Sequence, residues 1–132
     1  MKTAIPASIL ARQHEIMRQY FHELDKHLLD VQHGRVEAIF SVKDFASLLH
    51  IHPTHLSNTI KHVTGRSPCN VFEERLCETA KTLLRETNEP IAEIARTMTY
   101  DPSNFTKFFK KYAGVTPSEY RHNLFQQEYL PK

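Results

Sequence analysis

The 132-residue sequence has few of the features that mark membrane, secreted or disulfide-bonded proteins. No stretch approaches the roughly 18 consecutive apolar residues of a membrane span, and Pro6 interrupts the apolar start that a signal peptide needs. Cysteine is scarce: Cys69 and Cys77 form no CxxC pair. We therefore expect reduced, structural thiols in a cytoplasmic protein that does not contact a membrane.

Recognisable catalytic and metal-binding motifs are also missing. The chain has no glycine-rich phosphate loop, no GxSxG elbow and no HExxH pair, so we do not expect an enzyme. Four histidines lie close together in the sequence, but no acid or cysteine among them completes a ligand set. They are His50, His52, His55 and His62. We expect neither a metal ion nor a cofactor.

Acidic residues are distributed unevenly along the chain. The formal net charge is only +2, which by itself argues weakly for a nucleic-acid partner. However, residues 45–72 contain no Asp or Glu, and none occurs between Asp101 and Glu119. Because a carboxylate would repel phosphate, these two acid-free windows favour contact with nucleic acid.

Apolar residues recur at helical spacing almost throughout, and no segment alternates as a strand would. A long amphipathic helix is expected over residues 7–31, and Ser41 is expected to cap the next helix. Proline then takes the first position of five further helices, where its missing N–H has no helical partner. The apolar stripe of the long helix consists of Leu10, Met17, Phe21, Leu24, Leu28 and Val31. The helix-starting prolines are Pro53, Pro68, Pro90, Pro102 and Pro117, with Ser67, Asp101 and Thr116 as N-caps. The predicted fold is all-α with seven helices.

An internal repeat becomes visible when the chain is shifted by 49 residues. Similar residues then face each other without a gap from Val42 to Pro68. The matched pairs include Ala46 with Ala95, Pro53 with Pro102, Leu56 with Phe105, Ile60 with Phe109, Lys61 with Lys110 and Gly65 with Gly114. Each copy has a short helix with an alanine, a tight turn and a second helix that ends at glycine. This is the helix-turn-helix pattern, whose second helix enters the DNA major groove.

The residues also resemble the DNA-binding domain of AraC/XylS transcription regulators, from about Ser41 to Arg121. The segments that carry the resemblance are "GRSP", "AKTLLRET", "IAEIA", "NFTKFFKKYAG" and "GVTPSEYR". The resemblance implies two helix-turn-helix units, at 41–65 and 90–113, joined by a connector helix at 68–87. Residues 1–40 precede this domain as a helix and loop, and residues 122–132 follow it as a tail.

Two turns depart from the family pattern. Thr99 and Tyr100 replace the usual glycine and phenylalanine, and the segment from Ala95 to Phe105 is one residue shorter than usual. In the first unit, His50 and His52 replace the usual small or polar residues. A left-handed residue in the second turn, without glycine, would cost roughly 1 kcal/mol.

By resemblance, two groups of residues on the second helices contact DNA. The expected base-reading residues are Thr54, Ser57 and Asn58 in the first unit and Ser103, Asn104 and Lys107 in the second. The expected phosphate contacts are Lys61, His62, Lys110 and Lys111. Contacts to phosphate or water remain the alternative for each base-reading residue. A monomer could then read successive major grooves about 34 Å apart.

The predicted function is therefore sequence-specific binding of double-stranded DNA in transcription regulation, with RNA polymerase as a partner implied by the resemblance. Two alternatives stay open. One is a protein-interaction module or antagonist that pairs with another regulator through the helix at 7–31, and the other is a DNA binder without sequence preference. The chain is expected to be a monomer, or a weak dimer through the same helix. About 40 residues precede the first unit, too few for an effector domain, so we expect either that the protein is regulated through its abundance or that the chain is a fragment.

Overall fold

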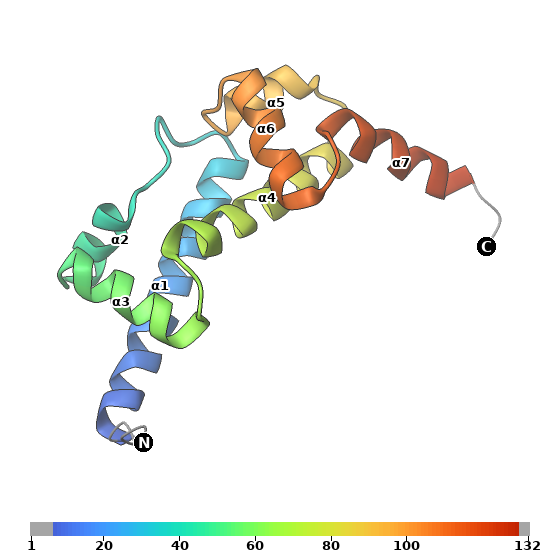
Figure 1. Cartoon of the computed structure of the whole chain (residues 1–132). Coiled ribbons are helices and arrows are strands. Elements are labelled where there is room, and N and C mark those ends of the chain that lie inside the picture. The colour runs from blue at the N-terminus through green and yellow to red at the C-terminus, as the bar shows by residue number, and fades with distance from the viewer. Residues whose placement is uncertain (1–6, 130–132) are drawn as a thin grey trace. The chain divides into compact units, whose positions relative to one another are not determined.

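A computed structural model describes residues 7–129, which form seven helices and no strand (Figure 1). The helices are α1 (Ala7–Gln32), α2 (Val42–Leu49), α3 (Pro53–Thr64), α4 (Pro68–Glu86), α5 (Ile91–Thr97), α6 (Pro102–Ala113) and α7 (Pro117–Tyr129). This confirms the all-α fold class and all seven predicted helices. The tail expected after Arg121 is largely helical, because α7 continues to Tyr129.

Four of the five prolines begin their helices as predicted, but the prediction for Pro90 is wrong. Pro90 is the N-cap of α5, with an extended backbone (φ −56°, ψ 147°). Its carbonyl accepts from the N–H groups of Glu93 and Ile94, at 3.0 and 3.1 Å, so the helix begins one residue later, at Ile91. Ser67 and Thr116 cap α4 and α7 as expected, each with a side-chain oxygen 3.2 Å from a backbone nitrogen of the first turn.

The described chain divides into two compact units. The first contains residues 7–27 with 40–72, and the second contains residues 28–39 with 73–129. The first unit therefore holds α2, α3 and most of α1, and the second holds α5, α6, α7 and most of α4. Each helix-turn-helix copy lies in a unit of its own.

In the first unit, α1 packs its apolar stripe against the first helix-turn-helix. The Tyr20 ring meets the Phe45 ring edge-on, with 5.4 Å between centroids. The core residues of this unit are Ile16, Met17, Tyr20, Leu24, Phe45, Ala46, Leu56, Ile60 and Val71. Leu10, the first residue of the stripe, lies outside this core and is 40% exposed. It lies in the first turns of α1, whose side chains are exposed from Ala7 to Arg12, and Ile16 and Tyr20 take its place in the core.

A buried histidine connects α1 to the segment that precedes α2. His27 is 4% exposed, and its Nε2 atom accepts from the N–H of Phe40 at 3.0 Å. Its ring also stacks on the Phe40 ring, with 4.0 Å between centroids. The hydrogen bond satisfies the polar edge of a ring that is otherwise packed among aromatic side chains.

The second unit has a core of leucine and phenylalanine side chains. Its fully buried large residues are Leu76, Leu84, Ile94, Met98, Phe105 and Phe109. Arg121 of α7 donates to three backbone carbonyls near the end of α4, those of Leu84, Thr87 and Glu89, at 3.2, 3.3 and 2.6 Å. The Leu84 carbonyl belongs to the last turn of α4, where carbonyls lack a helical partner, and Thr87 and Glu89 follow the helix. The three bonds therefore fix α7 to the end of α4 and to the segment after it.

Candidate nucleic-acid interface

The turn between α2 and α3 is shaped by two histidines. His50 ends α2 in the left-handed conformation, with φ 58°. His52 is the N-cap of α3, and its Nδ1 atom accepts from the N–H of Thr54 at 3.1 Å. An imidazole nitrogen can accept only when it carries no proton, so this cap requires the neutral ring. The histidine thus performs the capping role that serine or aspartate usually has.

The turn between α5 and α6 repeats this geometry with other side chains. Thr99, which lies 49 residues after His50, is also left-handed, with φ 65°. Asp101, 49 residues after His52, caps α6 through its carboxylate, which lies 3.2 Å from the backbone nitrogen of Ser103. Within residues 7–129, His50 and Thr99 are the two residues other than glycine with positive φ. The second turn, which lacks the usual glycine, therefore contains a residue in the left-handed conformation. Because Thr99 is β-branched, its backbone is strained there.

The recognition helices, α3 and α6, present their side chains in the same register. Each has 12 residues, and each ends at a left-handed glycine, Gly65 or Gly114. When α3 is aligned with α6 at the 49-residue shift, every matched position has the same degree of burial. The sequence repeat therefore extends to the structure: matching positions of α3 and α6 face the core or the solvent alike.

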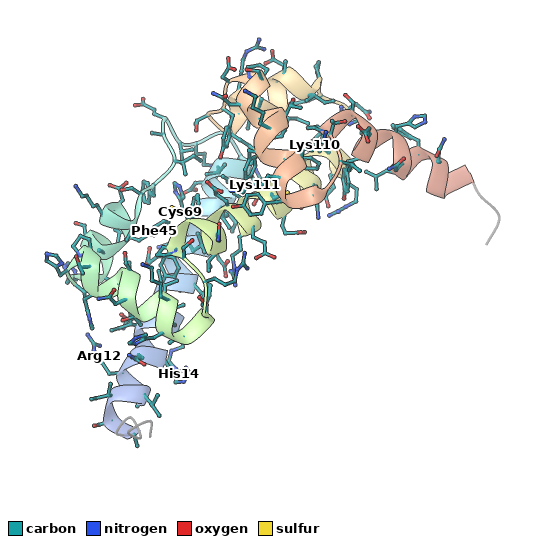
Figure 2. The ribbon with its side chains drawn as sticks, in the orientation of Figure 1. Arg12, His14, Phe45, Cys69, Lys110 and Lys111 are labelled. Atoms are coloured by element: carbon teal, nitrogen blue, oxygen red, sulfur yellow. The ribbon has the colours of Figure 1, made fainter. Side chains whose placement is uncertain are left out.

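The predicted DNA-contacting residues lie on the solvent side of these helices. Nine of the ten are exposed: Thr54, Asn58, Lys61, His62, Ser103, Asn104, Lys107, Lys110 and Lys111. Ser57 is half-buried. Figure 2 shows the labelled side chains of Lys110 and Lys111 on α6. Each helix thus presents five predicted contact residues in its own unit, in the acid-free windows of the sequence.

Two of these side chains already have partners in the protein. The Ser103 hydroxyl donates to the Asp101 carboxylate at 2.6 Å, which leaves only its oxygen lone pairs to accept from a base. This hydrogen bond also lowers the pKa of Asp101 below its usual value. The Lys111 ammonium lies 5.2 Å from the centroid of the Tyr112 ring, within the range of a cation–π contact. Lys110 has a similar place on the helix and is the simpler phosphate contact.

The sequence pattern places Phe108 on the core face of α6, as the structure does, but it missed the matching inward position of α3, Thr59. Thr59 is 2% exposed, and its hydroxyl donates to the His55 carbonyl of its own helix at 2.8 Å. Phe108 has the matching place in α6, where its ring stacks on Tyr100 with 4.9 Å between centroids. Burial, with a smaller contribution from the charge of Glu73, raises the pKa of Tyr100 to about 12. The repeat alignment of Thr59 with Phe108 was the signal that could have placed Thr59 in the core.

Other kinds of site find little support in the described part of the chain. No group of three or more His, Cys, Asp or Glu side chains between residues 7 and 129 is arranged to hold a metal ion. None of the helices described has both the length and the apolar character needed to cross a bilayer. Cys69 is exposed and Cys77 is buried. Burial raises the pKa of the Cys77 thiol to about 11, which disfavours the reactive thiolate.

Comparison with known proteins agrees with this geometry. The model of the helix-turn-helix domain family matches residues 45–123. YobQ, a transcriptional regulator of Bacillus subtilis, is 31% identical over 97 residues, which cover 73% of this chain and 40% of YobQ. The arabinose operon regulatory protein of Salmonella typhimurium is 27% identical over 119 residues, which cover 86% of this chain and 42% of that protein. The chain thus spans less than half the length of these relatives.

A solved structure extends the agreement to three dimensions. The C-terminal domain of AraT, a response regulator from Geobacillus stearothermophilus, superposes with a TM-score of 0.70 at 31% identity. The alignment covers 82% of this chain and 84% of that domain. The family match begins within α2 and continues through α3, α4, α5 and α6 into α7, so it includes both recognition helices and the helix between the copies. The chain belongs to the AraC/XylS family of helix-turn-helix regulators.

Proposed function

We propose that this chain binds a specific double-stranded DNA sequence and regulates transcription, with α3 and α6 inserted into successive major grooves. Asn58 and Lys107, which match each other in the repeat, are the principal base-reading residues of the two helices. An amide can pair with adenine through two hydrogen bonds, and a lysine can donate to guanine. Thr54, Ser57, Ser103 and Asn104 supply the remaining base contacts.

One observation carries the proposal: the two recognition helices have the same pattern of burial and both face solvent with polar or basic side chains. A helix whose only task was to fill a core would not need such a face twice. Lys61 and Lys110 occupy the same position in the two copies, where they serve as phosphate contacts. His62 and Lys111 form a second such pair. Phosphate contacts add affinity and salt dependence, whereas base contacts add specificity.

Selection from a pool of random DNA fragments at about 150 mM salt tests this function. We expect enrichment of one bipartite sequence, with two conserved elements separated by about one helical turn. Binding without any enriched sequence would contradict specific recognition and support the non-specific alternative. Absence of DNA binding, together with retention of another regulator, would support the interaction-module alternative.

A second candidate function is supported by the start of α1. Ile9 and Leu10 are 48% and 40% exposed, so the apolar stripe continues beyond the part that packs in the first unit. Contact with another regulator, or weak dimerisation, would bury these side chains. Sedimentation of the chain with Leu10→Asp against the unchanged chain tests this: a lower average mass for the variant supports it, and equal masses contradict dimerisation. Contact with RNA polymerase rests on family membership alone.

A further inference from the structure

Tyr112, in the last turn of α6, makes a contact that the repeat does not explain. Its hydroxyl donates to the carboxylate of Glu73 at 2.5 Å. The two residues are 39 positions apart, and Glu73 lies on α4, so the bond joins the recognition helix to the connector inside the second unit. The matching residue in α3 is Val63, which has no hydroxyl and cannot form such a bond.

The charge on Glu73 makes this contact stronger than a bond between neutral groups. A phenol that donates to a carboxylate forms a charge-assisted hydrogen bond, roughly twice as strong as a neutral one. Glu73 is the first acid after the acid-free window of residues 45–72. Its charge also contributes to the raised pKa of Tyr100, which directly precedes the N-cap of α6. One carboxylate of α4 therefore acts on a tyrosine in the last turn of α6 and on another just before its N-cap.

The Tyr112 ring contributes separately from its hydroxyl. The Lys111 ammonium lies 5.2 Å from the ring centroid, and the ring is 5.8 Å from that of Phe108. Removal of the hydroxyl alone would leave both ring contacts in place. The hydrogen bond can therefore be tested apart from the packing.

We propose that Tyr112 is a positioning residue: its bond to Glu73 fixes the rotation and tilt of α6, and so the places of Asn104 and Lys107. A helix of 12 residues is about 18 Å long, so a small rotation at its last turn moves side chains near its start. The base-reading residues Ser103, Asn104 and Lys107 lie in the first half of α6, whereas Tyr112 lies in its last turn. This inference rests on the proposed function, because it assigns a role in base recognition.

Tyr112→Phe tests the inference in the full chain, with Tyr120→Phe as the matched control. Tyr120 also packs its ring in the second unit, 5.6 Å from that of Phe109. We expect Tyr112→Phe to weaken binding to the selected DNA about tenfold, as for a lost bond to a charged group. Base preference should relax at the positions that α6 reads and stay unchanged at those that α3 reads. Equal loss of base preference at the positions read by α6 and by α3, or no loss at either, would overturn the inference.

The Glu73 side of the bond supplies a rescue test. Glu73→Gln keeps an oxygen acceptor and should retain most of the preference at the α6 positions, whereas Glu73→Ala should lose it. The double variant Tyr112→Phe with Glu73→Ala should bind no worse than either single variant, because both remove the same bond. Additive losses would show independent roles and overturn the inference.

Hydrogen exchange without DNA separates this inference from the proposed function. Tyr112→Phe should speed amide exchange in α6 and leave α3 unchanged, since α3 belongs to the other unit. If the unchanged chain selects no DNA sequence, the proposed function fails whatever α6 does. If it selects a sequence but the variant exchanges and binds like the unchanged chain, only the positioning role fails.

Discussion

The two helix-turn-helix copies have the left-handed residue, the N-cap and the inward-facing residue at matching positions, but the side chains at these positions differ. The left-handed residue is His50 in the first copy and Thr99 in the second. The N-cap is an imidazole in the first and a carboxylate in the second. The inward position of the second helix holds Thr59 in one copy and Phe108, stacked on Tyr100, in the other.

This difference shows which features fix the geometry of the turn. The two copies share a buried alanine, a residue in the left-handed conformation, an N-cap acceptor and a terminal glycine. They do not share the residue types at the turn or the cap. The geometry therefore follows from what each position must do, such as accept a hydrogen bond or adopt a positive φ, and several side chains can do it.

Truncation of the matched core residues should have the largest effect. Leu56 and Phe105 are both 0% exposed. We expect Phe105→Ala to lower the free energy of unfolding by about 3–5 kcal/mol and Leu56→Ala by about 2–5 kcal/mol, because each leaves a cavity. Urea denaturation measures the loss, and hydrogen exchange shows where it falls. Each variant should loosen its own unit most; loosening of the opposite unit would contradict the division into two compact units.

Removal of the matched base-reading side chains should have the next largest effect. Asn58→Ala and Lys107→Ala should each reduce discrimination at one base position by about 1–3 kcal/mol. Lys110→Ala is the control: it should weaken binding to all sequences and lower the salt slope by about 1. Titrations of selected and single-base-changed DNA over a range of salt distinguish the three. Equal weakening on every sequence by Asn58→Ala would show that it does not read a base.

Replacement of the left-handed residues by glycine should stabilise both copies modestly. Thr99→Gly should raise the free energy of unfolding by about 1 kcal/mol, because glycine adopts positive φ without a clash between Cβ and the backbone. His50→Gly should give less, since histidine tolerates this conformation better than a β-branched residue. Thermal or urea denaturation of both variants is the measurement. A loss of stability for Thr99→Gly would mean that its side chain contributes more than its conformation costs.

Replacement of the charged N-cap of α6, Asp101, should have the smallest effect on stability, and that effect should depend on pH. The hydrogen bond from Ser103 lowers the pKa of Asp101 in the folded protein, so its contribution is present above the usual pKa of an aspartate. That contribution is lost as the pH falls through the lowered value. Asp101→Asn should therefore reduce stability at pH 7 and flatten its dependence on pH below about 4. Urea denaturation at several pH values checks this, and an unchanged acid profile would contradict it.

Much of the fold could be predicted because its signals are local. Proline at the first helical position, serine or threonine before it and glycine after the last turn mark the helix ends within a few residues. The error at Pro90 has a physical cause, because a proline can serve as an N-cap through its carbonyl. How far the stripe of α1 is buried was open from sequence, because a periodic stripe can continue beyond the surface that covers it.

The candidate interface was predictable in outline but not in its internal contacts. The repeat and the acid-free windows indicate which helix faces solvent, and the structure agrees. The bonds of Ser103 to Asp101 and of Tyr112 to Glu73 depend on side-chain rotamers and on packing between helices. The left-handed state of Thr99 was also open from sequence, since intrinsic preference disfavours it and the surrounding turn determines it.

Footprinting of the unchanged chain on its selected DNA tests the central claim, that both copies read DNA, most directly. The account predicts two protected major-groove segments on one face of the duplex, with centres about 10–10.5 base pairs apart. Asn58→Ala should weaken one segment and Lys107→Ala the other. A single protected segment that responds to only one of these variants would contradict it, because one helix-turn-helix copy would then suffice.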